Sequence, residues 1–148
     1  MTPAMNSDFS LKALLPAGLL CGLVINLVDI PNSALLVAPD WNQVLAAQGI
    51  TPNGPAIGGY FTTVHFLYGV LIVFTYAVMR ARFRPGAGVA LGAAGLLLAV
   101  NRLFGFGSVV MGQMPASIWL RFSASMVLGS LLGGVAGGWL YDRRQART

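Results

Sequence analysis

The feature that most constrains the fold is an apolar run, residues 89–110, that is long enough to cross a membrane and yet contains Asn101 and Arg102. A transmembrane helix needs about 20 predominantly apolar residues. An arginine in the hydrocarbon costs about 2.5–3.5 kcal/mol on insertion scales, so it faces protein, water or a counter-charge rather than lipid. The run therefore predicts a membrane helix whose polar side chains find partners on other helices.

Three further apolar segments supply those partners. Only 9% of the residues are charged, whereas soluble domains contain about 25%. Four spans of about 20 residues would use most of the 148 residues and leave no room for a separate soluble domain. We therefore expect one all-α integral membrane domain over residues 1–148. Its fold would be a four-transmembrane-helix bundle with spans at about 13–33, 58–79, 88–110 and 117–140.

The basic residues outside these spans predict the topology. They lie before the first span, after the second and after the fourth, whereas the two connections on the other side contain neither lysine nor arginine. By the positive-inside rule, both termini are cytoplasmic. The formal net charge of +5 does not indicate a nucleic-acid partner, because the basic residues do not alternate with aromatic ones in a patch. These residues are Lys12, Arg80, Arg82, Arg84, Arg143, Arg144 and Arg147.

The first outer connection, residues 37–58, is rich in proline, glycine and asparagine. Pro31 is expected to kink or end the span that precedes it. Within the connection, Asp40 is placed to cap a short helix, Trp41 gives it an apolar edge and Gly49 would end it. We expect this short helix to lie in the membrane interface, and a plain loop is the alternative.

Small residues at helical spacing predict close helix packing. Such GxxxG-type pairs let two membrane helices approach through their backbones. We expect the chain to form a homodimer within the lipid bilayer through the glycine-rich faces of the third or fourth span. The glycines concerned are Gly18, Gly22, Gly88, Gly92, Gly129, Gly133 and Gly137.

A layer of polar side chains is predicted near the outer side of the membrane. At about 1.5 Å per residue, Asp29, His65, Arg102 and Arg121 each lie roughly 6–12 Å below the outer surface. Asp29 is the only acidic residue inside a span, so it is the expected ion-pair partner of Arg102, with Arg121 second. The same layer is expected to include Asn26, Tyr68 and Asn101.

This layer has two interpretations. In the first, the ion pair and its hydrogen-bonded neighbours only fix the helix register. In the second, they form an outward-facing pocket for a small polar or anionic ligand, with Arg102 and Arg121 as cationic contacts and His65 and Tyr68 as donors.

Other chemistry has little support in the sequence. A single histidine cannot provide bis-histidine haem ligation within one chain. Cys21, the only cysteine, excludes an intrachain disulfide and a cysteine-based metal site. No nucleophile elbow is present. We therefore expect no enzyme activity, no cofactor and no metal.

Two motifs carry a resemblance to a known group of proteins. Residues 74–86 place an aromatic-Tyr-Ala triplet before Arg-x-Arg-Phe-x-Pro-Gly, and residues 22–26 end in Asn26 with Asp29 about one turn later. Over nearly the whole chain, the sequence resembles a group of small bacterial four-span membrane proteins. The resemblance implies a four-span fold and a bacterial inner-membrane location, and it implies no activity. It does not extend to His65 and Arg102.

Two functional hypotheses follow. The first is a binding or accessory membrane protein whose polar layer holds the helices together or receives a ligand. The second is a small dimeric four-helix transporter, by analogy of size with four-span multidrug exporters. Those exporters resemble one another in a glutamate in the first span, whereas this chain has Asp29 near the outer end. Proton-coupled efflux would require Asp29 to titrate freely.

Overall fold

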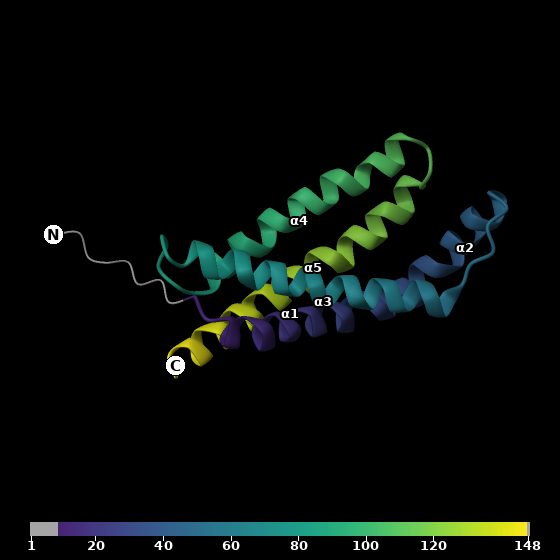
Figure 1. Ribbon diagram of the computed structural model, residues 1–148. Coiled ribbons are helices and arrows are strands. Elements are labelled where there is room, and N and C mark those ends of the chain that lie inside the picture. The colour runs from purple at the N-terminus through teal and green to yellow at the C-terminus, as the bar shows by residue number, and fades with distance from the viewer. Residues whose placement is uncertain (1–8, 148) are drawn as a thin grey trace.

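The computed structural model describes residues 9–147, and all of its regular structure is helical (Figure 1). Four helices are long and apolar enough to cross a membrane, and the described residues form no strand. The prediction of an all-α chain with four helices of membrane-spanning length and composition is therefore confirmed. Residues 1–8 and 148 of the predicted domain lie outside the described part. The elements are α1 (Leu11–Asn32), η1 (Ser33–Val37), α2 (Ala38–Ala47), α3 (Gly54–Met79), α4 (Ala87–Val110) and α5 (Ala116–Gln145).

The four long helices run between two ends of the molecule. The connection between α3 and α4 lies with the start of α1 and the end of α5 at one end, which we call the terminal end. The connections from α2 to α3 and from α4 to α5 lie at the other, the distal end (Figure 1).

The first helix continues beyond the predicted span. Pro31 lies inside α1, and the wider turns of the π-helix η1 begin two residues later. Proline has no backbone N–H and crowds the preceding turn, and a π-helical turn is one way to continue past such a defect. Residues 11–47 are thus helical without a break, and α2 bends away from the direction of α1 (Figure 1).

Asp40 does not cap α2, which differs from the prediction. The helix already begins at Ala38, with Val37 at the N-cap and no side-chain cap, and this places Asp40 in the first turn. The end of α2 has the bonding pattern of a Schellman motif. The N–H of Ile50 donates to the Leu45 carbonyl at 2.9 Å, and the intervening Gly49 has a φ of +74°.

Glycines bring α1 close to α3. A Cβ added to Gly69 of α3 would lie 2.3 Å from the Gly22 nitrogen and 2.6 Å from the Gly18 carbonyl oxygen. Backbone therefore packs against backbone at this crossing, as GxxxG-type pairs allow.

The α5 glycines also pack inside the chain. A Cβ on Gly133 would lie 2.7 Å from the Cys21 carbonyl oxygen, and one on Gly137 would lie 3.0 Å from that of Ala17. Gly129 likewise faces Ile25 of α1. By contrast, a Cβ on Gly88 of α4 would meet nothing within 4 Å. Gly129, Gly133 and Gly137 of α5 therefore pack against α1, whereas Gly88, Gly95 and Gly107 of α4 face open space.

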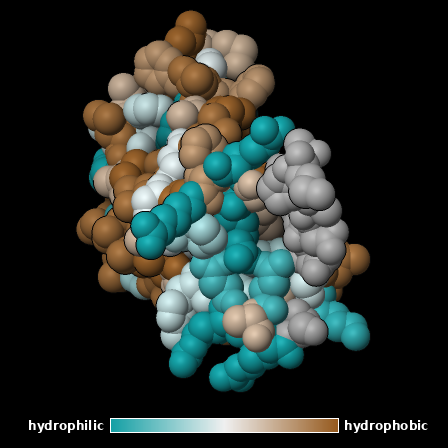
Figure 2. All heavy atoms as spheres, turned by 90° about the vertical axis from the view of Figure 1, so that its left-hand side faces the viewer, coloured by the Kyte–Doolittle hydropathy of each residue, from teal (hydrophilic) through white to brown (hydrophobic). Residues whose placement is uncertain are grey.

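The outside of the molecule is strongly apolar. On α1, leucines at every fourth position form an exposed stripe: Leu15, Leu19, Leu23 and Leu27, with exposed fractions of 45–66%. Helical periodicity places such residues on one face. Viewed from the terminal end, hydrophilic side chains gather in the middle and lower part of the molecule, and hydrophobic ones cover its upper and left-hand parts (Figure 2).

Candidate functional site

Asp29 forms the centre of a polar node between α1 and α5 near the distal end. Its side chain is buried, and each carboxylate oxygen has a hydroxyl donor. Ser125 Oγ donates to Oδ1 at 2.6 Å, and Ser33 Oγ donates to Oδ2 at 3.0 Å. Asn32 Nδ2 donates to Ser125 Oγ at 2.9 Å. The carboxylate thus has the hydrogen bonds that a buried carboxylate requires.

His65 joins this node from α3. Asn26 Nδ2 donates to the Gly22 carbonyl at 2.9 Å, so Asn26 Oδ1 is left as an acceptor for His65 Nδ1, 3.0 Å away. His65 Nδ1 therefore carries the hydrogen. His65 Nε2 lies 3.8 Å from Asp29 Oδ2, which is too far for a hydrogen bond. Asn26 thus fixes the imidazole ring so that its second nitrogen faces the carboxylate.

Arg102 does not pair with Asp29. Its Nε donates to Asn101 Oδ1 at 3.1 Å, a terminal nitrogen donates to the same oxygen, and the other terminal nitrogen donates to Ser123 Oγ at 3.3 Å. No ion pair joins Arg102 to a carboxylate within residues 9–147. The structure therefore lacks the predicted Asp29–Arg102 ion pair. Arg102 lies on α4, which packs against α3 and α5, and the guanidinium finds its hydroxyl partner on α5.

Arg121 is also not a partner of Asp29. Its guanidinium donates to the Leu36 carbonyl at 2.6 Å and pairs with the Asp40 carboxylate at 2.5 Å. Both charged side chains are partly exposed, at 39% and 46%. Arg121 thus ties α5 to η1 and α2, and it lines neither of the cavities described next.

A cavity of about 190 Å³, here called the polar cavity, lies between α1, α3, α4 and α5. Two buried donors that line it, Tyr68 Oη and Trp119 Nε1, have no hydrogen-bond partner within the described chain. Buried polar groups are rarely left without a partner. The cavity therefore has unused hydrogen-bonding capacity, mostly for an acceptor. Its polar lining residues are Asp29, His65, Tyr68, Asn101, Arg102, Ser108 and Trp119.

A second cavity of about 400 Å³, here called the apolar cavity, lies beside it under η1 and α2. Its lining is largely apolar and includes the aromatic side chains Trp41, Phe61 and Phe122. Asp29 and His65 line both cavities. These two residues therefore lie between two neighbouring cavities.

Five of the seven predicted polar residues line the polar cavity, namely Asp29, His65, Tyr68, Asn101 and Arg102. Asn26 orients His65 from outside the cavity, and Arg121 lies apart. Trp119 was not predicted as a site residue. It lies four residues before Ser123, whose hydroxyl donates to its carbonyl at 2.8 Å, so a helical-face analysis of α5 would have found it.

A second polar node, at the terminal end, was also not predicted. Tyr76 Oη on α3 donates to Asp142 Oδ2 on α5 at 2.5 Å, and Arg80 lies 3.1 Å from Asp142 Oδ1. Arg80 also lies over the Tyr141 ring, 5.4 Å from its centre. This node joins α3 to α5, so Arg80 makes structural contacts in addition to being one of the residues on which the predicted topology rests.

The described residues contain no group of three or more histidine, cysteine or acidic side chains that could hold a metal ion. Comparison with protein-family models, curated proteins and solved structures finds no match to this chain.

Proposed function

We propose that this is a multi-pass protein of the bacterial inner (plasma) membrane that binds a small anionic or polar ligand in its polar cavity. It would be a binding or accessory protein rather than an enzyme. Both termini would be cytoplasmic, the four long helices would form a bundle, and α2 would lie in the outer interface. The cavity would then face the outer side of the membrane.

One observation carries the ligand proposal: Arg102 lines the cavity without a carboxylate partner in the described chain. Its described hydrogen bonds are to a neutral amide and a neutral hydroxyl. Tyr68 Oη and Trp119 Nε1 add two donors without partners. A guanidinium with further donors favours an anion or a strong hydrogen-bond acceptor.

The structural and binding interpretations of the polar layer then apply to different residues. Asp29 has its acceptors satisfied by Ser33 and Ser125, which suits a residue that holds α1 against α5. Arg102 has guanidinium donors beside open volume. We therefore propose that Asp29 fixes the register between α1 and α5 and that Arg102 contacts the ligand.

The orientation rests on the positions of the arginines. The α3–α4 connection and the regions beside both termini hold seven basic residues, and the connections at the distal end hold none. The positive-inside rule then favours a cytoplasmic terminal end. The resemblance noted above supports the bacterial inner membrane.

Thermal unfolding of the detergent-purified protein tests the ligand proposal. Sodium chloride, nitrate, acetate, sulfate and phosphate would be titrated at constant ionic strength, balanced with gluconate. We expect at least one of these anions to raise the unfolding temperature saturably, since a ligand at 100 times its Kd stabilises by about 2.7 kcal/mol. Arg102→Gln should abolish that shift.

Arg82→Gln is the matched control, because it removes the same charge from an exposed position away from the cavity. It should leave the shift intact. An equal shift in wild type and both variants, or no shift with any anion, would contradict the proposal.

A small dimeric transporter is the second candidate, and one observation favours it. Asp29 forms no ion pair with an arginine within the described chain and lines both cavities, so the predicted pairing with Arg102 does not occupy it. The open glycine positions of α4 would supply a dimer face. Only a transporter would move the bound anion into sealed vesicles, which separates the two candidates.

A further inference from the structure

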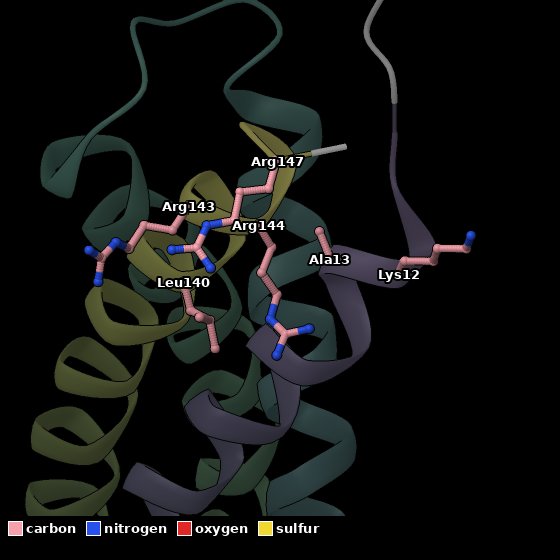
Figure 3. Close-up of a pocket in the computed structure, with 6 residues that line it drawn as sticks. All are labelled: Lys12, Ala13, Leu140, Arg143, Arg144 and Arg147. Atoms are coloured by element: carbon pink, nitrogen blue, oxygen red, sulfur yellow. The ribbon is translucent and has the colours of Figure 1, made fainter.

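A basic hollow of about 400 Å³ lies at the terminal end, between the start of α1 and the end of α5 (Figure 3). Arg144 and Arg147 lie in the middle of this region, and Lys12 and Arg143 flank it on opposite sides. Ala13 and Leu140 complete its lining. Four cationic side chains therefore surround one partly apolar depression.

These charges have no acidic partner in the described chain. Of its three acidic residues, Asp29 and Asp40 are engaged near the distal end, and Asp142 is engaged by Tyr76 and Arg80. None of the three forms an ion pair with a cation of the hollow. The hollow thus concentrates positive charge that no acidic side chain of residues 9–147 pairs with.

The apolar surroundings of the hollow point to a lipid. The exposed leucine stripe of α1 passes the hollow, since Leu11 and Leu15 stand on either side of Lys12 in the sequence. On α5, Trp139 is 54% exposed, and Arg143 stacks over its ring at 4.7 Å. Tryptophan is enriched at the level of lipid headgroups. The positive end of the α1 macrodipole also lies here, which favours a phosphate group.

We propose that the hollow binds the phosphodiester headgroup of an anionic phospholipid, whose acyl chains lie along the α1 leucine stripe. Arg144 and Arg147 contact the phosphate, and Lys12 and Arg143 add to the local potential. Basic pockets between membrane helices recognise anionic headgroups through the same chemistry. This site is independent of the polar cavity, which lies near the other end of the molecule.

Binding of short-chain phosphatidylglycerol to the purified protein in neutral detergent tests the proposal, with the lipid adducts counted by native mass spectrometry. Each basic residue near a lipid surface contributes about 1 kcal/mol, so the double variant Arg144→Gln/Arg147→Gln should bind about 20- to 30-fold more weakly. Arg82→Gln/Arg84→Gln removes the same charge from exposed positions outside the hollow and should change the affinity by less than about 3-fold. Phosphatidylcholine of equal chain length should bind wild type weakly.

Three outcomes would overturn the proposal. Equal weakening of phosphatidylglycerol binding in the two double variants would show a diffuse effect of charge instead of a binding site. Competition by inorganic phosphate as strong as that by the lipid would assign the hollow to a free anion. Equal binding of phosphatidylcholine would remove the role of charge. Arg144→Lys/Arg147→Lys retains the charge and should restore most of the affinity, which separates a loss of binding from a loss of folding.

Discussion

At the scale of single residues, the sharpest prediction concerns the buried side chain of Asp29. Its bond to Ser125 joins α1 to α5, so Asp29→Asn leaves a buried hydroxyl facing an amide that cannot replace both acceptors. We expect a loss of about 1–3 kcal/mol in the free energy of unfolding, measured by SDS titration in detergent. A double-mutant cycle of Asp29→Asn with Ser125→Ala should show a coupling of about 0.5–3 kcal/mol in the free energy of unfolding.

The cycle of Asp29→Asn with Arg102→Gln is the contrasting case. The structure contains no ion pair between these residues, so their coupling should be smaller than that between Asp29 and Ser125. A larger coupling would mean that the carboxylate and the guanidinium are direct partners.

The sequence predicted which residues share a level but not which ones touch. The rise of 1.5 Å per residue predicts the depth of each side chain. Asp29, His65 and Arg102, which share one predicted depth, line one cavity in the structure. The direction of a side chain around its helix axis depends on which helices are neighbours. Asp29 therefore accepts a hydrogen bond from Ser125, and Arg121 forms an ion pair with Asp40.

At the scale of helices, the α1–α3 crossing can be tested at one glycine. Gly69→Ala would place a Cβ 2.3 Å from the Gly22 nitrogen, and backbone atoms cannot give way as side chains do. We expect it to cost about 1–3 kcal/mol or more in the free energy of unfolding, because α1 and α3 must separate.

Gly95→Ala in α4 is the matched control, because its Cβ would meet nothing within 4 Å of the described chain. It should be neutral or slightly stabilising, since alanine favours helices over glycine. Equal loss in both variants would mean that the backbone approach at Gly69 does not stabilise the fold. If only Gly95→Ala weakened the protein, α4 would be the helix that packs on a second copy.

Helix positions were easier to predict than helix ends. An apolar run of 20 residues has few alternatives to a membrane helix, so four of them could be placed. Pro31 predicted a kink or an end in the first span, and the helix continues past it through the π-helical turn of η1. α5 also extends to Gln145, beyond the membrane span predicted at about 117–140, because nothing in the basic segment that follows the span breaks a helix.

At the scale of the whole molecule, cysteine labelling tests the proposed orientation. Cys21 is fully buried, so the wild-type protein should scarcely react with a membrane-impermeant maleimide. Gln113→Cys places a thiol on the exposed distal connection, and Ala81→Cys places one on the exposed α3–α4 connection. In spheroplasts, only the Gln113→Cys variant should be labelled. Labelling of Ala81→Cys alone would reverse the topology.

The position of α1 between α3 and α5 has a consequence for biosynthesis. The hydroxyl that satisfies Asp29 Oδ1 lies 96 residues later in the chain. At about 5–20 residues per second, synthesis of that interval takes roughly 5–20 s. During this time α1 is already made, and Asp29 Oδ1 lacks its hydrogen bond from Ser125. Until α5 is inserted, another group must therefore hydrogen-bond to the Asp29 carboxylate. Water, the insertion machinery or an early α1–α3 hairpin could provide it.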